Sequence, residues 1–160
     1  MRLPTLVFMA LLTAPSLAAE ISGIVTEVHD GDSLTLVNSQ VTYKIRLADV
    51  DAPEWRQTYG KDSQASLLHT CGLKRATAET LGEERFGRTL ARLTCAGVDA
   101  NRRQIERGWA WVFRRYAPKD SPLYALEKEA RRARRGLWQE DYPMPPWEWR
   151  RSRGASEVQE

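Results

Sequence analysis

The chain has 160 residues, a length that favours one domain, and its 24 basic and 21 acidic residues give a formal net charge of +3. This charge is too small to indicate nucleic-acid binding by itself. Beyond the N-terminus no segment is apolar enough over a sufficient length to span a bilayer, which excludes an integral membrane protein. Nineteen of the basic residues are arginines, whose guanidinium groups match phosphate oxygens with two-point contacts, although a bias in genome composition explains them equally well.

Residues 1–19 are typical of a secretory signal peptide. Arg2 supplies the positive charge, a short apolar run follows, and Ser16-Leu17-Ala18 has the small residues of a cleavage site. We therefore expect a soluble protein that is exported to the periplasm or secreted. It should not associate with a membrane, and a monomer with no obligate protein partner is expected.

The first half of the chain predicts strands over residues 21–28, 33–37, 41–47, 73–80 and 89–95. Asp30-Gly31 is typical of a hairpin turn between the first two. A short helix is expected over residues 62–70, and a turn at Gly82-Glu83-Glu84 should precede the last strand.

The second half predicts helices. Asp99 can cap a helix that runs through Arg107, and Ser121-Pro122 begins another, which presents the apolar stripe Leu123, Leu126, Ala130 and Ala133 and ends at Gly136. We expect residues 20–140 to form one α+β, mainly β, domain, a small barrel with packed helices. In residues 141–160, a Pro/Trp-rich extension, irregular chain is expected over 142–149 and a frayed end from 150.

Two acid-rich segments and two arginines could carry chemistry. Asp32 and Asp51 offer oxygen ligands, which Ca²⁺ and Mg²⁺ prefer, whereas no Cys/His spacing indicates zinc. Glu54 follows Pro53, which restricts its backbone, so its carboxylate could orient or deprotonate a water. Arg46 and Arg88 could bind a phosphate. Taken singly, Asp30-Gly31-Asp32 is better explained as an ordinary hairpin turn, and the segment around Glu54 is equally a solvated polar loop.

The ordered motifs DGDS, RLADVDAPE, FGRTLA, an N-x-x-x-I-E-R-G-W-A segment and EARRARRGLW together resemble the staphylococcal nuclease family over about residues 22–138. The resemblance implies a five-stranded OB-type barrel with three helices, and Ca²⁺-dependent cleavage of DNA and RNA with little sequence specificity that leaves 3′-phosphate ends. It implies that Arg46, Glu54 and Arg88 are catalytic, that Asp32, Asp51 and the Ala52 carbonyl bind the metal, and that Asp30 lies just outside the metal ligands.

The same resemblance implies a substrate-binding rim formed by Arg85, Phe86, Arg114 and Tyr116. Here the chain departs from the type enzyme. In this rim, Arg85-Phe86 replaces a Lys-Tyr pair and Arg114 replaces one of two cleft tyrosines. At the metal site, Ala52 replaces a threonine, which keeps the backbone carbonyl but would lose a hydroxyl contact to a bound water. These departures affect nucleotide binding more than the chemical centre, so affinity and base preference stay open.

Two other interpretations stay possible from the residues. One is a noncatalytic OB-fold module that binds single strands through stacked aromatic residues; the full set of acids and arginines favours an enzyme instead. The other is an interaction protein built around the Pro/Trp-rich extension, for which no ligand-binding motif is visible.

Cys71 and Cys95 are the only cysteines, and export would favour a disulfide. They are equidistant from residue 83, the centre of the predicted turn. In a symmetric hairpin they would therefore oppose each other at its open end, within bonding range. Two independent buried thiols are the alternative.

Overall fold

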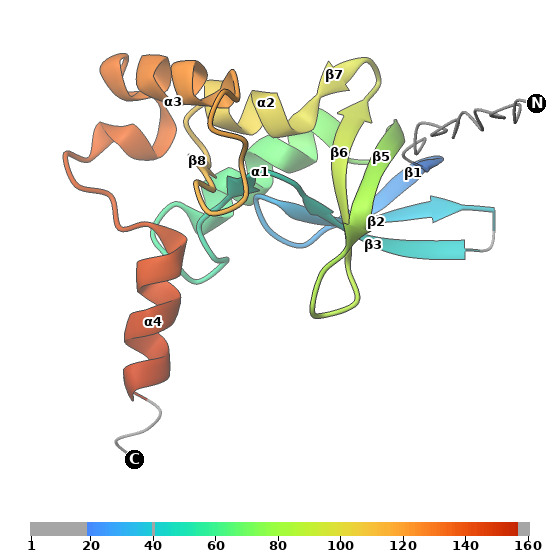
Figure 1. The fold of residues 1–160 in the computed structure, drawn as a ribbon, viewed down its shortest axis with the longest axis horizontal. Coiled ribbons are helices and arrows are strands. Elements are labelled where there is room, and N and C mark those ends of the chain that lie inside the picture. Colours follow the sequence, from blue (N-terminus) through green and yellow to red (C-terminus); the bar gives the residue numbers. More distant parts are fainter. Residues whose placement is uncertain (1–18, 40, 157–160) are drawn as a thin grey trace, which may run out of the picture.

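The computed structural model describes residues 19–39 and 41–156 (Figure 1). The predicted signal peptide lies outside the described residues, apart from Ala19. No helix in the described ranges combines the length and apolar character needed to cross a bilayer.

Five strands form the barrel that the sequence predicts. They are hydrogen-bonded in the order β3-β2-β1-β5-β6, each pair antiparallel, and a parallel β3–β6 pairing closes the ring. Closure leaves few unpaired edges. The strands are β1 (Glu20–Val28), β2 (Ser33–Asn38), β3 (Val41–Leu47), β5 (Arg75–Glu83) and β6 (Thr89–Cys95).

Short strands attach further segments to this barrel. β7 (Val98–Asp99) extends the sheet beyond β6, while β4 (Val50–Asp51) pairs with β8 (Trp111–Val112). The β4–β8 pair places Asp51 opposite Trp111. It therefore links the acid-rich segment after β3 to the aromatic segment sixty residues later in the chain.

Helices cover one end of the barrel. Figure 1 shows α1, α2 and α3 gathered there, whereas the last helix, α4, projects away from the body. The helices are α1 (Gly60–Cys71), α2 (Ala100–Glu106), α3 (Leu123–Arg132), the 3₁₀ helix Gly136–Gln139 and α4 (Pro146–Ser156). The α+β barrel with three packed helices is confirmed, but the expectation of irregular and frayed chain is wrong for α4.

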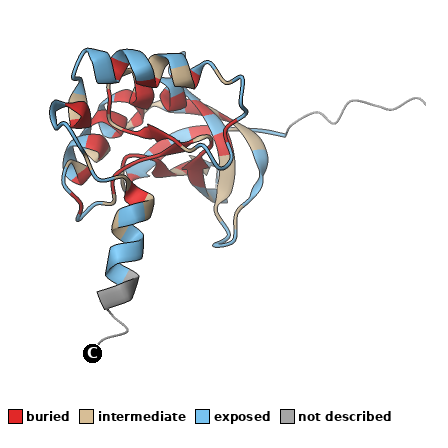
Figure 2. Ribbon diagram, turned by 60° about the vertical axis from the view of Figure 1, so that its left-hand side comes forward, coloured by how far each residue is buried: buried red, intermediate tan, exposed pale blue. Residues whose placement is uncertain are grey.

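The core lies between the barrel and the helices, where buried residues concentrate in Figure 2. Alternation along β6 sends Ala91, Leu93 and Cys95 inward. In α3, Leu123 and Ala130 are buried as predicted, but Ala133 is exposed because the helix ends at Arg132. Glu127 is buried in the same stripe and accepts a hydrogen bond from the Val112 backbone N–H at 3.0 Å.

Two buried amides on α2 hold the loops that border the site. Asn101 donates to the Ala48 carbonyl at 2.8 Å and accepts from the Leu93 N–H at 3.0 Å. Gln104 donates to the Gly31 carbonyl at 2.7 Å. Asp99 caps this helix by accepting from the Arg102 N–H, as the sequence predicts.

Cys71 and Cys95 form a disulfide with their Cα atoms 5.1 Å apart. The pairing is confirmed, but the hairpin geometry behind the prediction is wrong. Cys71 is the last residue of α1, and Cys95 pairs across the sheet with Ala76. The β5–β6 turn covers residues 84–88 rather than 82–84, and a bulge between Thr80 and Gly82 shifts the register. The bond therefore joins a helix to the barrel.

Candidate active site

A cavity of about 350 Å³ gathers most of the residues that the sequence singles out. The β1–β2 turn, β3, β4, the loop after β4 and the β5–β6 turn contribute to its walls. Its lining consists of Asp30, Asp32, Arg46, Asp51, Ala52, Glu54, Glu84, Phe86, Arg88, Phe113 and Arg150. All the predicted catalytic and metal-binding residues thus meet in one place.

Arg46 lies between the two aspartates at the base of this cavity. Its Nη2 atom is 3.1 Å from Asp32 Oδ2 and 3.0 Å from Asp51 Oδ1, and all three side chains are buried. Its Nη1 atom donates to the carbonyls of Leu47 and Val50 at 2.6 and 2.9 Å. Arg46 is thus held in a fixed position, as a buried guanidinium must be.

Burial raises the pKa of Asp32 well above its usual range, and the nearby Asp30 and Asp51 carboxylates raise it further. Arg46 and the Ala52 N–H, which donates to Asp32 Oδ2 at 2.6 Å, lower the pKa in opposition. Asp30 in turn accepts from the Asp32 N–H at 2.9 Å, which orders the turn. This crowding of acidic groups favours any additional positive charge.

Glu54 stands at the opening of the cavity with its side chain 34% exposed. Gln57 restrains the backbone here, because its Oε1 accepts from the Glu54 N–H at 3.2 Å and its own N–H donates to the Glu54 carbonyl at 2.8 Å. The Glu54 carboxylate is therefore attached to an ordered loop while it remains in contact with solvent.

Arg88 reaches the cavity from the β5–β6 turn. Its Nε–H donates to Glu84 Oε1 in the same turn. Burial alone would lower the pKa of Arg88, but the hydrogen bond and the charge of Glu84 raise it, so the guanidinium is charged. Glu84 was not identified from the sequence; it lies four residues before Arg88, a separation that a turn can bring within reach.

The predicted rim residues divide into two groups. Phe86 lines the cavity and is 75% exposed, with Arg85 lying over its ring at 5.5 Å. Arg85 itself, Arg114 and Tyr116 do not line it. Arg114 pairs instead with the buried Glu127 at 3.1 Å, and Tyr116 packs edge-on against Phe113 with ring centres 5.0 Å apart.

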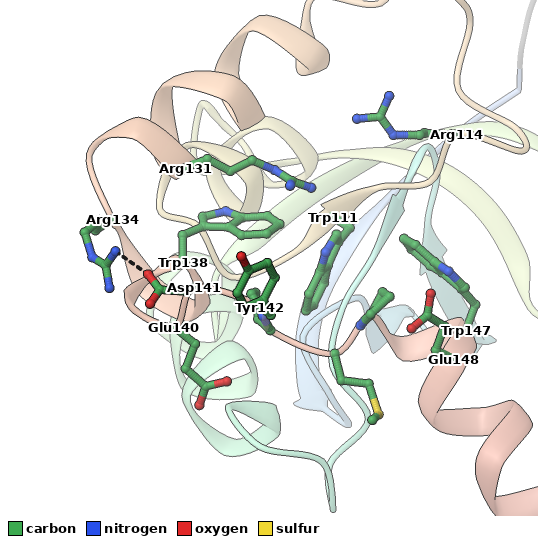
Figure 3. A pocket seen from close by; sticks show the side chains of 13 residues that line it. Trp111, Arg114, Arg131, Arg134, Trp138, Glu140, Asp141, Tyr142, Trp147 and Glu148 are labelled. Atoms are coloured by element: carbon green, nitrogen blue, oxygen red, sulfur yellow. Dashed lines mark hydrogen bonds and ion pairs between the residues drawn. The ribbon is translucent and has the colours of Figure 1, made fainter.

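Figure 3 shows a second cavity, of about 640 Å³, with Trp147 in its lining. Trp147 lines it and contacts Phe113, which lines the first cavity. Arg131 lies 3.8 Å over the Trp138 ring. The three arginines in this lining are matched by three acids, so it carries no charge surplus; they are Arg114, Arg131, Arg134, Glu140, Asp141 and Glu148.

Arg150 is the residue that sequence reasoning missed most completely. It comes from α4, and it bridges Glu54 Oε1 at 2.7 Å and Asp51 Oδ2 at 2.8 Å. Burial alone would lower the pKa of Arg150, but its hydrogen bonds to Asp51 and Glu54 raise it above the ordinary value. Pro146 begins α4, and proline in a first helical turn is a start signal that could have found this helix.

Comparisons with known proteins identify the family of this chain. The family model described as staphylococcal nuclease homologue matches residues 44–140. A protein described as an "Uncharacterized endonuclease" from Escherichia coli is 37% identical over 137 residues, which cover 85% of this chain and 89% of that protein. A micrococcal nuclease from Shigella flexneri is 35% identical over 144 residues, covering 84% and 83% of the two chains. The chain therefore belongs to the staphylococcal nuclease family.

Proposed function

We propose that this protein is a Ca²⁺-dependent nuclease that cuts DNA and RNA with little sequence specificity and leaves 3′-phosphate ends. As a member of its family it is a phosphodiesterase that hydrolyses nucleic acid; the cation, the substrate range and the cleaved bond are the proposal. One observation carries it: Asp32, Asp51, Arg46, Glu54 and Arg88, drawn from four segments of the chain, line a single cavity.

The donor set fits a hard cation. Five carboxylates and three guanidinium groups line the cavity, which leaves a surplus of negative charge, and the available donors are oxygens, as calcium prefers. Asp32, Asp51 and the Ala52 carbonyl would hold the ion. When bound, it would polarise a phosphate oxygen and offset charge that develops in the transition state.

Arg46 and Arg88 would hold the scissile phosphate. A phosphodiester gains negative charge on its equatorial oxygens as the attacking oxygen approaches, and guanidinium groups already in position stabilise that charge more than the ground state. Arg46 is held by two carbonyls and two aspartates, and Arg88 by Glu84. Neither side chain has to be ordered during the reaction.

Glu54 would act on water. Its carboxylate is ordered by the loop and partly exposed, so it can accept a hydrogen bond from a water molecule and orient it, or take its proton, as that water attacks phosphorus. The bond from phosphorus to the 5′ oxygen then breaks, and that oxygen takes a proton from solvent to leave as a 5′-hydroxyl group. The phosphate remains on the 3′ oxygen of the upstream fragment.

Digestion of plasmid DNA, a single-stranded oligonucleotide and an RNA with Ca²⁺ or with excess chelator tests the proposal. We expect cleavage of all three only with Ca²⁺. Products should become primers for a polymerase only after phosphatase treatment, because a 3′-phosphate blocks extension. Undiminished cleavage in chelator would refute the metal requirement, and products that are extended without phosphatase would refute the assigned bond.

We also propose that the protein acts outside the cytoplasm as a monomer. Residues 1–19 support export, and the Cys71–Cys95 disulfide is a bond that persists in oxidising compartments. Fractionation of cells that express the full chain should find the shortened, processed protein in the periplasm or the medium. Retention of the unprocessed chain in the cytoplasm would contradict this.

A further inference from the structure

α4 is attached to the domain by its first turn. Trp147 stacks on Phe113 with ring planes 10° apart and centres 6.2 Å apart, and it meets Trp111 edge-on at 6.3 Å. Just before the helix, Gln57 donates to the Met144 carbonyl at 2.6 Å. Figure 2 shows the buried part of α4 at its start, whereas residues 150–153 are exposed. The attachment is therefore local and lies beside the candidate active site.

This attachment delivers Arg150 to the cavity. Residues three positions apart lie on the same face of a helix, so anchoring Trp147 turns Arg150 toward the carboxylates. Its guanidinium contacts both Asp51 oxygens, Oδ2 at 2.8 Å and Oδ1 at 3.3 Å, and Glu54 Oε1 at 2.7 Å. One side chain thus engages both the proposed cation ligand and the proposed water-binding acid.

Arg150 in this position blocks a cation from Asp51 Oδ2, the oxygen opposite the one that Arg46 bonds. Both Asp51 oxygens already accept from arginines, since Oδ1 also accepts from Arg46 at 3.0 Å. A divalent ion would need an Asp51 oxygen, and it would repel the nearby guanidinium strongly because the site is poorly solvated. The ion and Arg150 therefore compete for Asp51 Oδ2, which Arg150 contacts at 2.8 Å, whereas Arg46 bonds the other oxygen, Oδ1.

We propose that α4 is a gate on the cation site, in which Arg150 and the cation compete for Asp51. The site is closed while Arg150 bridges Asp51 and Glu54, and it opens when an ion displaces the guanidinium. This inference rests on the proposed cation-dependent function. The Arg150 side chain is 43% exposed, so it can withdraw into solvent, whereas Asp51 is 1% exposed and would be left without that partner unless an ion replaces it.

Calorimetric titration of the processed protein with CaCl₂, in the absence of substrate, tests the competition. The apparent dissociation constant equals the intrinsic one divided by the open fraction, so Arg150→Gln should bind Ca²⁺ about tenfold more tightly than the parent protein. Arg151→Gln is the matched control, because it removes the same charge from the next residue. Arg151 is exposed, so Arg151→Gln should change the Ca²⁺ affinity only slightly.

Trp147→Ala provides a second variant in which Arg150 is intact. Loss of the stacking on Phe113 should free α4 and so tighten Ca²⁺ binding, as Arg150→Gln does, provided thermal unfolding shows a folded domain.

Equal Ca²⁺ affinity in the parent, Arg150→Gln and Arg151→Gln proteins would overturn the gate and leave the nuclease assignment standing. Failure of all variants to bind Ca²⁺ would refute the cation site and the gate with it. Weaker binding of a short oligonucleotide by Arg150→Gln, with Ca²⁺ affinity unchanged, would make Arg150 a substrate ligand and also overturn the gate.

Discussion

Arg46 and Asp51 are joined by a hydrogen bond of 3.0 Å between Nη2 and Oδ1, although only 10% and 1% of their side chains are exposed. Buried charges of opposite sign are stable only as partners. The pair therefore links the strand β3 to the acid-rich segment that follows it. It forms part of the base of the cavity, around which the other lining groups lie.

Removing any one of the three proposed catalytic side chains should slow cleavage by a factor on the order of 10² or more, the usual effect of losing one transition-state stabiliser. The variants are Arg46→Ala, Glu54→Gln and Arg88→Ala, measured as kcat/KM on a labelled oligonucleotide. Arg46→Ala also leaves Asp32 and Asp51 without a buried partner, so its thermal stability must be measured beside its activity. A loss below tenfold in a folded variant would remove that residue from the mechanism.

The disulfide between Cys71 and Cys95 should stabilise the domain by about 3 kcal/mol, the chain-entropy estimate for a loop of this size. The Cys71→Ala/Cys95→Ala double variant should unfold at lower urea concentration than the parent protein. Reductant should destabilise the parent and leave the double variant unchanged. Two free thiols per denatured, unreduced chain would show that the bond does not form.

Phe86 should contribute to substrate binding by stacking on a base. It lines the cavity and is exposed, whereas Tyr116 lies against Phe113 outside the lining. Alanine at residue 86 should weaken binding of a single-stranded oligonucleotide by about 1–3 kcal/mol, and alanine at residue 116 should have the smaller effect. The reverse order, measured by fluorescence anisotropy in Ca²⁺-free buffer, would place the base beside Tyr116.

Substrate affinity should fall as salt rises, because phosphate contacts release counterions from the nucleic acid. Arg85→Ala should reduce the slope of log affinity against log salt by about one unit if the residue meets a phosphate. Arg114→Ala should reduce it less, since Arg114 is already paired with Glu127. Arg75→Ala, an exposed arginine on β5, is the control, and an equal change in all three variants would indicate a diffuse charge effect.

Gly31→Ala should disturb the turn that carries Asp30 and Asp32. A Cβ atom at residue 31 would lie 1.8 Å from Ser63 Oγ and 2.7 Å from the Ala52 Cβ, so the turn or α1 would have to move. We expect a loss of about 1–3 kcal/mol in unfolding free energy and weaker Ca²⁺ binding, measured by urea unfolding and calorimetry. Thr42→Ala, at an exposed position of β3, should change neither, and unchanged Ca²⁺ affinity in Gly31→Ala would contradict the proposed role of this turn.

Local pattern was enough to predict most of the secondary structure. The predicted strand over residues 41–47 and the return strand over 89–95 have the bounds observed for β3 and β6, because alternation of side chains and turn residues are properties of short segments. The weakly apolar stretch after Cys71 was placed less well. The strand predicted to begin at residue 73 begins at Arg75, and the turn that follows it lies later in the chain than the predicted one. The bulge in this strand and the end of α1 at Cys71 cause the difference, and both depend on tertiary packing.

The sequence by itself predicted the barrel and its three packed helices, and it identified six of the eight acids and arginines that line the cavity, because these follow from periodicity and from ordered motifs; Glu84 and Arg150 were not identified. Only the tertiary structure decided that Arg150 meets Asp51 and Glu54, 99 and 96 residues earlier in the chain. It likewise decided that Arg114 pairs with Glu127 outside the cavity. Contacts of this kind depend on how α4 and α3 pack against the barrel. The local sequence pattern does not predict which charged residue, distant in the chain, a side chain will contact.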